Sequence, residues 1–113
     1  MKFEDDLHDW YIEGVILELS QMEIYVHFYG VRRTIKMSGV SRCLINYFLI
    51  KNIIYEAKIL SSPDDNLFKK ETERLHERYP FTPKEPHKIL PITPSVGADI
   101  TVEFTELSIH ETE

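Results

Sequence analysis

Apolar and polar residues alternate along the first third of the chain with the period of two that is typical of β-strands. Residues 11–19, 23–29 and 31–37 each carry this pattern, and short segments with polar residues or glycine separate them. We therefore predict three consecutive strands in an antiparallel meander. In the second strand the aliphatic side chains would face the core, and Tyr25 and His27 would point outward.

Two irregularities interrupt the alternation. Glu13 and Glu18 fall at positions of opposite parity, so a regular strand would bury one of them, whereas a β-bulge near Gly14 would place both outside. Toward the C-terminus the parity of the apolar residues switches, which predicts a second bulge near Thr105 or Glu106.

The middle of the chain predicts a fourth strand and a helix. Residues 40–48 fit either a short helix or a continued strand, and we favour a strand-like segment followed by an irregular turn. Residues 52–60 alternate as a strand would, with the odd-numbered apolar residues expected on one face. A helix is predicted from about Asp64 to Arg78, because aspartates that can accept its first backbone N–H groups precede a narrow apolar stripe.

Five of the six prolines lie between Pro80 and Pro94. Proline lacks the backbone N–H that helices and central strands require, so we expect a kinked loop here. Residues 99–105 alternate again and predict a final strand. Together the elements predict an α+β fold in one domain spanning residues 1–113: a single antiparallel, strongly twisted sheet of five or six strands, with one helix packed on one face. A small half-open barrel is the structural variant.

The chain of 113 residues carries a formal net charge of −6. Nucleic acids and anionic lipids are densely negative and would repel this surface, so we expect neither nucleic acid nor a membrane as partner, and a basic protein is favoured. No segment approaches the roughly 18 consecutive apolar residues that span a bilayer, and the acidic N-terminal residues do not form a signal peptide. We expect a cytoplasmic protein in which the lone Cys43 is a buried thiol.

The sequence contains no known catalytic or nucleotide-binding motif, and four glycines leave little material for a phosphate-binding loop. The five histidines are scattered singly, so no pair has the close spacing that is typical of a zinc site. A site that the fold assembles from His8, Asp9 and His87 is the alternative. We expect no enzymatic activity, no cofactor and no bound metal.

Four short motifs follow one another along the chain. They are Leu7-His8-Asp9-Trp10 with Ile12 and Val15, Gly39-Val40-Ser41-Arg42, Asn52-Ile53-Ile54-Tyr55, and Thr93-Pro94-Ser95-Val96-Gly97-Ala98-Asp99. In this order they resemble a group of small bacterial immunity proteins of polymorphic or contact-dependent toxin systems, and the resemblance extends over residues 7–109. It implies a cytoplasmic, cofactor-free domain that binds and neutralises a cognate toxin.

A nuclease is the class of toxin that the charge favours, because an enzyme that cleaves nucleic acid needs a basic cleft, which an acidic inhibitor can occlude. Two groups of residues are candidates for toxin contact: the outward row Tyr25, His27 and Tyr29, and the acids Glu103 and Glu106 of the last strand. For the row, the alternative is a sheet face that the helix or a loop covers. The alternative function is a stand-alone structural or regulatory interaction domain without a toxin partner.

Overall fold

The described part of the chain folds into one large sheet and one helix. The structure is a computed structural model that describes residues 7–81 and 87–112. Its elements, in chain order, are β1 (Tyr11–Glu18), β2 (Gln21–Phe28), β3 (Val31–Ser38), β4 (Arg42–Asn46), β5 (Ile53–Ala57), α2 (Asn66–Arg78), β6 (Lys88–Val96), β7 (Asp99–Phe104) and β8 (Glu106–Thr112). The strands follow the order β4-β7-β6-β5-β1-β2-β3-β8, and all neighbours are antiparallel.

The predicted strand number is therefore wrong: the sheet has eight strands and not five or six. It is open, with β4 and β8 as its two edges, rather than a half-open barrel of fewer strands. The difference arises because the proline-rich segment contributes β6, and because the chain after Thr105 forms a strand of its own, β8, at the opposite edge from β4.

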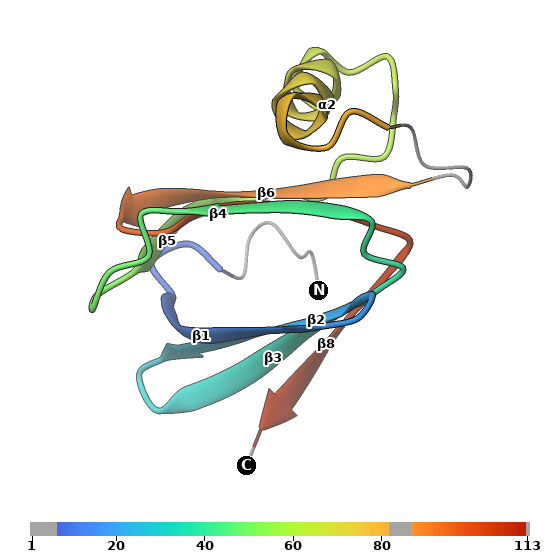
Figure 1. The fold of residues 1–113 in the computed structure, drawn as a ribbon. Coiled ribbons are helices and arrows are strands. Elements are labelled where there is room, and N and C mark those ends of the chain that lie inside the picture. Colours follow the sequence, from blue (N-terminus) through green and yellow to red (C-terminus); the bar gives the residue numbers. More distant parts are fainter. Residues whose placement is uncertain (1–6, 82–86, 113) are drawn as a thin grey trace.

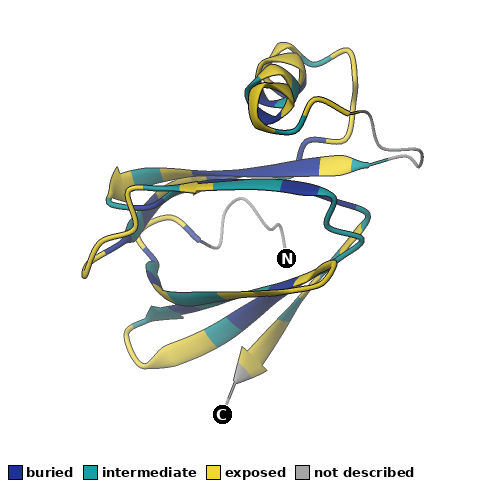
Figure 2. Cartoon of the chain, viewed as in Figure 1, coloured by how far each residue is buried: buried dark blue, intermediate teal, exposed yellow. Residues whose placement is uncertain are grey.

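The sheet folds over on itself, so that β4 and β6 lie opposite β1, β2 and β3 (Figure 1). Apolar side chains from both layers fill the space between them, among them Trp10, Ile24, Ile35, Leu90 and Phe104. Helix α2 lies on the outer side of the layer that contains β6, and its buried residues face the sheet (Figure 2). The helix therefore covers one layer and leaves the outer face of β1, β2 and β3 uncovered.

Between β7 and β8 the chain passes from one layer to the other through one residue, Thr105. Its backbone N–H donates to the carbonyl oxygen of Ser38 at 3.0 Å, and its hydroxyl donates to the same oxygen at 3.1 Å. Gly39 has a φ of +65° and lies so close to Thr105 that a Cβ atom would collide with it. The predicted irregularity near Thr105 is thus in the right place, but it is a break between β7 and β8 rather than a bulge within one strand.

The N-terminal meander agrees with the alternation. Strands β1, β2 and β3 pair in sequence, and the β1–β2 register shifts between Ile12 and Gly14, which confirms the predicted bulge. As a result both Glu13 and Glu18 are exposed. The strand alternative for residues 40–48 is also confirmed, since β4 is a strand that pairs with β7.

The predicted face of the fourth strand is wrong for the first part of β5, where the even-numbered Ile54 is buried and Tyr55 is exposed. Ala57, at the end of the strand, is buried as predicted. The register between β5 and β6 shifts on both sides of Ile54, and such irregularities reverse which side chains face the core. The strand also ends at Ala57, earlier than predicted.

The prolines do not prevent a strand, and here the prediction of a loop is wrong. Pro91 lies inside β6, opposite the gap between the end of β5 and the isolated bridge that joins Leu60 to Ile89. The N–H of Ile89 points to Leu60. The nitrogen of Pro91, two residues further along the strand, points to the same side. Because the gap lies on that side, the N–H that proline lacks is not needed for a hydrogen bond of the sheet. Pro83 and Pro86 lie outside the described residues.

Helix α2 confirms the predicted helix but begins two residues later. Asp65 is its N-cap and accepts a hydrogen bond from the backbone N–H of Leu67 at 2.8 Å. Phe68 and Leu75 are buried against Ile89 and Leu60 in a small second apolar cluster. No helix in residues 7–81 and 87–112 is long and apolar enough to cross a membrane.

Candidate functional site

Four connecting segments meet at one end of the sheet: the turn of residues 7–10, the β2–β3 turn, the β4–β5 loop and the β6–β7 turn (Figure 1). Hydrogen bonds hold the turn of residues 7–10 against β5 and the β6–β7 turn against the β4–β5 loop. The N–H of Asp9 donates to the carbonyl of Ile54 at 2.8 Å, and the N–H of Ala98 donates to Asn52 Oδ1 at 2.9 Å. Because tyrosine, histidine and phenylalanine side chains gather here, we call this region the aromatic end.

The motif Leu7-His8-Asp9-Trp10 forms a turn that separates packing residues from exposed ones. Leu7 and Trp10 belong to the core, and the N–H of Trp10 donates to the carbonyl of Leu7 at 3.1 Å. His8 and Asp9 point outward, with His8 Nε2 3.5 Å from Asp9 Oδ2. Asp9 has a φ of 68°, in the left-handed region that aspartate tolerates better than most residues. The turn therefore presents a carboxylate at the aromatic end.

Beside this turn lies a pocket of about 360 Å³. Its walls are formed by Asp9, Tyr11, His27, Phe28, Tyr29 and Ile53. The rings of Tyr11 and His27 stack with centroids 5.2 Å apart, and Lys51 Nζ lies 5.9 Å from the centroid of Tyr11. The pocket thus combines aromatic walls with one carboxylate.

The β4–β5 loop next to the pocket exposes four consecutive apolar side chains, those of residues 47–50. Asn52, which is buried, fixes the loop: its Nδ2 donates to the carbonyl of Leu49 at 2.8 Å, and its Oδ1 accepts from the N–H of Leu49 at 2.9 Å. Gly97 lies against Asn52 and Lys51, where a Cβ atom would collide with both. The loop is held from two sides although its side chains are in solvent.

The structure separates the five residues predicted for toxin contact. His27 and Tyr29 line the pocket at the aromatic end; Tyr29 lies in the β2–β3 turn with a φ of 47° and is 91% exposed. Tyr25 lies on the outer face of β2, where α2 does not cover it, and its hydroxyl donates to the Glu23 carboxylate, which raises the pKa of Tyr25. Contact of these residues with a toxin stays a prediction.

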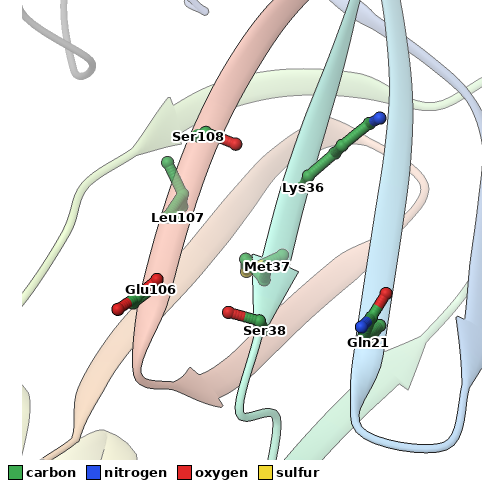
Figure 3. Close-up of a pocket in the computed structure, with 7 residues that line it drawn as sticks. All are labelled: Gln21, Lys36, Met37, Ser38, Glu106, Leu107 and Ser108. Carbon is green, nitrogen blue, oxygen red and sulfur yellow. The ribbon is translucent and has the colours of Figure 1, made fainter.

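Glu106 lies at the opposite end of the uncovered face. It lines a smaller pocket of about 200 Å³ (Figure 3), together with Gln21, Lys36, Met37, Ser38, Leu107 and Ser108. Glu106 is exposed, so its carboxylate is accessible. It is not close to the aromatic end, because β8 pairs with β3 so that Glu106 faces Ser38, whereas Tyr29 follows the far end of β2.

Glu103 is fully buried, and the prediction that it presents its carboxylate to a partner is wrong. Arg42 donates to both of its carboxylate oxygens at 2.8 Å, and the hydroxyl of Ser41 donates to Oε1 at 2.6 Å. His87 Nε2 lies 3.1 Å from Oε2. Burial alone would raise the pKa of Glu103, but the hydrogen bonds from Arg42 and Ser41 and the positive charges nearby hold it below its ordinary value.

A metal centre is not assembled in the described ranges 7–81 and 87–112. Within them no three His, Cys, Asp or Glu side chains are placed to hold a metal ion. His8 and Asp9 lie at the aromatic end, and His87 lies beside Glu103 under the helix, so the alternative metal site is not brought together. Cys43 is half-buried, and burial raises the pKa of its thiol.

The sequence reasoning missed the β4–β5 loop and Asn52. An irregular turn was predicted after the strand-like segment, but nothing in the composition of residues 47–50 distinguishes exposed from buried apolar residues. The available signal is the asparagine that follows them, since asparagine often fixes turns through its side-chain amide.

No protein-family model matches the chain, and a search of curated proteins gives no significant match.

Proposed function

We propose that this protein binds and neutralises a cognate bacterial toxin in the cytoplasm, with the aromatic end as its contact surface. It acts by occlusion and not by catalysis, and the partner is a basic toxin domain, a nuclease being the preferred class. The resemblance of the four motifs to immunity proteins supports this proposal.

The observation that carries the proposal is the β4–β5 loop. Four exposed apolar side chains in a row are costly to keep in water and are typical of surfaces that become buried in a complex. The hydrogen bonds of Asn52 fix the loop before any partner arrives, so little conformational entropy is lost on binding. A rigid, protruding apolar loop beside an aromatic pocket is well suited to anchor a protein interface.

The charge supports a basic partner. Helix α2 contains four basic and three acidic residues, so the net charge of −6 does not come from the helix. An acidic inhibitor is steered toward a basic nuclease cleft at long range, and the apolar loop then slows dissociation.

The test uses the toxin domain encoded beside this protein. Co-expression of the parent protein should rescue cells from that toxin, and the purified pair should associate more slowly as salt is raised. A double variant, Leu49→Ser with Ile50→Ser, should lose protection because it removes the apolar anchor without touching the backbone contacts of Asn52.

The matched control is Leu19→Ser. Leu19 is 95% exposed and lies in the β1–β2 turn at the opposite end of the sheet. It should protect as well as the parent. Failure of the parent to bind and protect would overturn the toxin proposal in favour of an interaction domain without a toxin, and equal protection by the double variant would overturn the assigned surface.

A further inference from the structure

The pocket at the aromatic end has the composition of a receptor for a positively charged group. Tyr11, His27, Phe28 and Tyr29 contribute rings to its walls, and Asp9 contributes a carboxylate. Aromatic faces attract cations through the negative potential above the ring, and a carboxylate adds a charge-assisted hydrogen bond. Neither feature alone specifies a ligand, but together they favour an organic cation that has both a flat or apolar surface and N–H donors.

The carboxylate of Asp9 has no permanent counter-charge in the described part of the chain. Its ion pair there is with His8, at 3.5 Å, and both side chains are more than half exposed. Histidine is not a permanent cation as lysine and arginine are. By contrast, the neighbouring Glu13 is already engaged by Arg32 at 3.3 Å. Asp9 is therefore the acid at this end that remains available to an incoming cation.

The protein's own Lys51 places one ammonium group near the aromatic wall of the pocket. Lys51 Nζ lies 5.9 Å from the centroid of Tyr11, which is at the outer limit of a cation–π contact. The ring of Tyr11 is also stacked on that of His27. A loosely held lysine at the rim leaves the ring open to a better-placed cation and would compete with it weakly.

Size and backbone geometry agree with a single side chain as the occupant. A volume of about 360 Å³ is at the lower end of the range for small-molecule sites, about 300–1,000 Å³. Asp9 and Tyr29 both line the pocket with positive φ, 68° and 47°, and a tyrosine in this conformation costs free energy that the fold must offset. The two residues with unfavourable backbone conformations thus place the Asp9 carboxylate and the Tyr29 ring in the wall of the same pocket.

We propose that this pocket binds the guanidinium side chain of an arginine on a basic protein partner, stacked on the tyrosine rings and bonded to Asp9. The inference deepens the proposed function and rests on it for the identity of the partner. Guanidinium is preferred over ammonium because its plane stacks on aromatic rings and its fork of N–H groups fits a carboxylate.

The binding experiment needs no toxin. N-acetyl-arginine amide is titrated into the ¹⁵N-labelled full chain and followed by NMR, with N-acetyl-citrulline amide as the neutral isostere. The arginine probe should shift the resonances of Asp9, Tyr11 and Tyr29 in a saturable way, with an affinity of about 1 mM as expected for one side chain. The citrulline probe should bind at least about fivefold more weakly, because it lacks the charge.

Three variants test the assignment of roles. Asp9→Asn should weaken the arginine probe by about tenfold, since it removes the charge-assisted bond, and asparagine tolerates the positive φ, so the fold is kept. Tyr11→Leu should weaken it by about two- to fivefold. Lys51→Met should strengthen it slightly by removing the competing ammonium. The control, Glu106→Gln, makes the same change of charge at the other pocket and should leave binding unchanged.

The outcomes separate this inference from the proposed function. Equal binding of arginine and citrulline probes, equal effects of Asp9→Asn and Glu106→Gln, or the absence of saturable binding would overturn the arginine receptor, even if the protein protects against a toxin. Tighter binding of spermidine than of the arginine probe would assign the pocket to a free polyamine and overturn the inference. Arginine binding that depends on Asp9, in a protein that neutralises no toxin, would support the receptor and refute the proposed function.

Discussion

Two carboxylates, Glu103 on the helix side of the sheet and Asp9 at the aromatic end, show how differently this chain uses similar residues. Glu103 is fully buried and is bound by Arg42 and Ser41. Arg42 in turn donates to the carbonyls of Tyr79 and Phe81, at 3.1 and 2.8 Å, and so ties the end of α2 to the sheet. Asp9 is exposed, and its ion pair among the described residues is with His8.

A second polar contact repeats the arrangement on the helix side. Glu71 of α2 is buried, and the hydroxyl of Thr101 on β7 donates to it at 3.0 Å, while Arg74 donates to it at 2.9 Å. Charged residues under the helix therefore hold elements together, whereas Asp9 and Tyr29 at the aromatic end are exposed. The difference teaches that an acidic residue in a strand is a candidate contact only where no second layer covers it.

The largest expected effect is on the helix side. Glu103→Gln leaves the Arg42 guanidinium buried without its counter-charge and should lower the free energy of unfolding by about 3–5 kcal/mol. Urea unfolding measures it, with Glu106→Gln as the exposed control that should change stability by less than about 0.5 kcal/mol. A loss below about 1 kcal/mol for Glu103→Gln would contradict a structural role for the pair.

Asn52 is a buried polar side chain that fixes the β4–β5 loop at the aromatic end, and Asn52→Ala should lower the free energy of unfolding by about 1–3 kcal/mol. The substitution leaves the backbone groups of Leu49 and Ala98 without their partner. It should also raise hydrogen exchange in the β4–β5 loop while leaving exchange in α2 unchanged. Unchanged exchange in the loop would show that other contacts fix it.

Lowering the pH should remove the contribution of Glu103 to the free energy of unfolding. The pKa of Glu103 is lower in the folded protein than in the unfolded chain, where it is about 4.3. Its charge therefore contributes full stability above about pH 4.3, and this contribution is lost as the pH falls from there through the lower folded value. The stability difference between parent and Glu103→Gln should shrink when urea unfolding is repeated from pH 6 down to pH 3. A constant difference would refute this assignment.

The smallest effect on stability is expected at the apolar loop. Leu49→Ser with Ile50→Ser should change the free energy of unfolding by less than about 0.5 kcal/mol, because both side chains are exposed. Thermal unfolding of the double variant and of Leu19→Ser should therefore coincide. A large loss in the double variant alone would mean that the loop packs on the fold, and the contrast between the two regions would fail.

The sequence predicted those parts of the fold in which one face of each strand is buried. The bulge near Gly14 followed from two glutamates of opposite parity, and the helix followed from its cap and its stripe. The prediction for Glu103 in strand β7 is wrong because both faces of this strand are covered, one by the core and the other by α2. Glu103 follows the alternation of an exposed residue but is buried. The prediction of a loop at Pro91 is wrong for a similar reason, since the gap that its nitrogen faces is a property of the neighbouring strands and not of the local sequence.

The candidate site was predictable to a similar extent. The period of two placed His27 on the outer face, and Tyr29 follows it in the turn, so two of the six residues that line the pocket could be anticipated. The β4–β5 loop could not, because Asn52 also accepts the N–H of Ala98, which follows 46 residues later in the chain. Whether residues 47–50 are buried or exposed depends on that distant contact, and no local pattern encodes it.

The pairing of β4 with β7 also constrains the order in which the protein can fold. Strand β4 has β7 as its only neighbour in the sheet, and Arg42 and Glu103 are 61 residues apart. While a ribosome makes the chain, β1, β2 and β3 can pair as soon as they emerge, but β4 waits until β7 has been synthesised. Closing such a long loop is entropically slow. The two layers therefore join late, and α2 gains its anchor on Arg42 only in that last step.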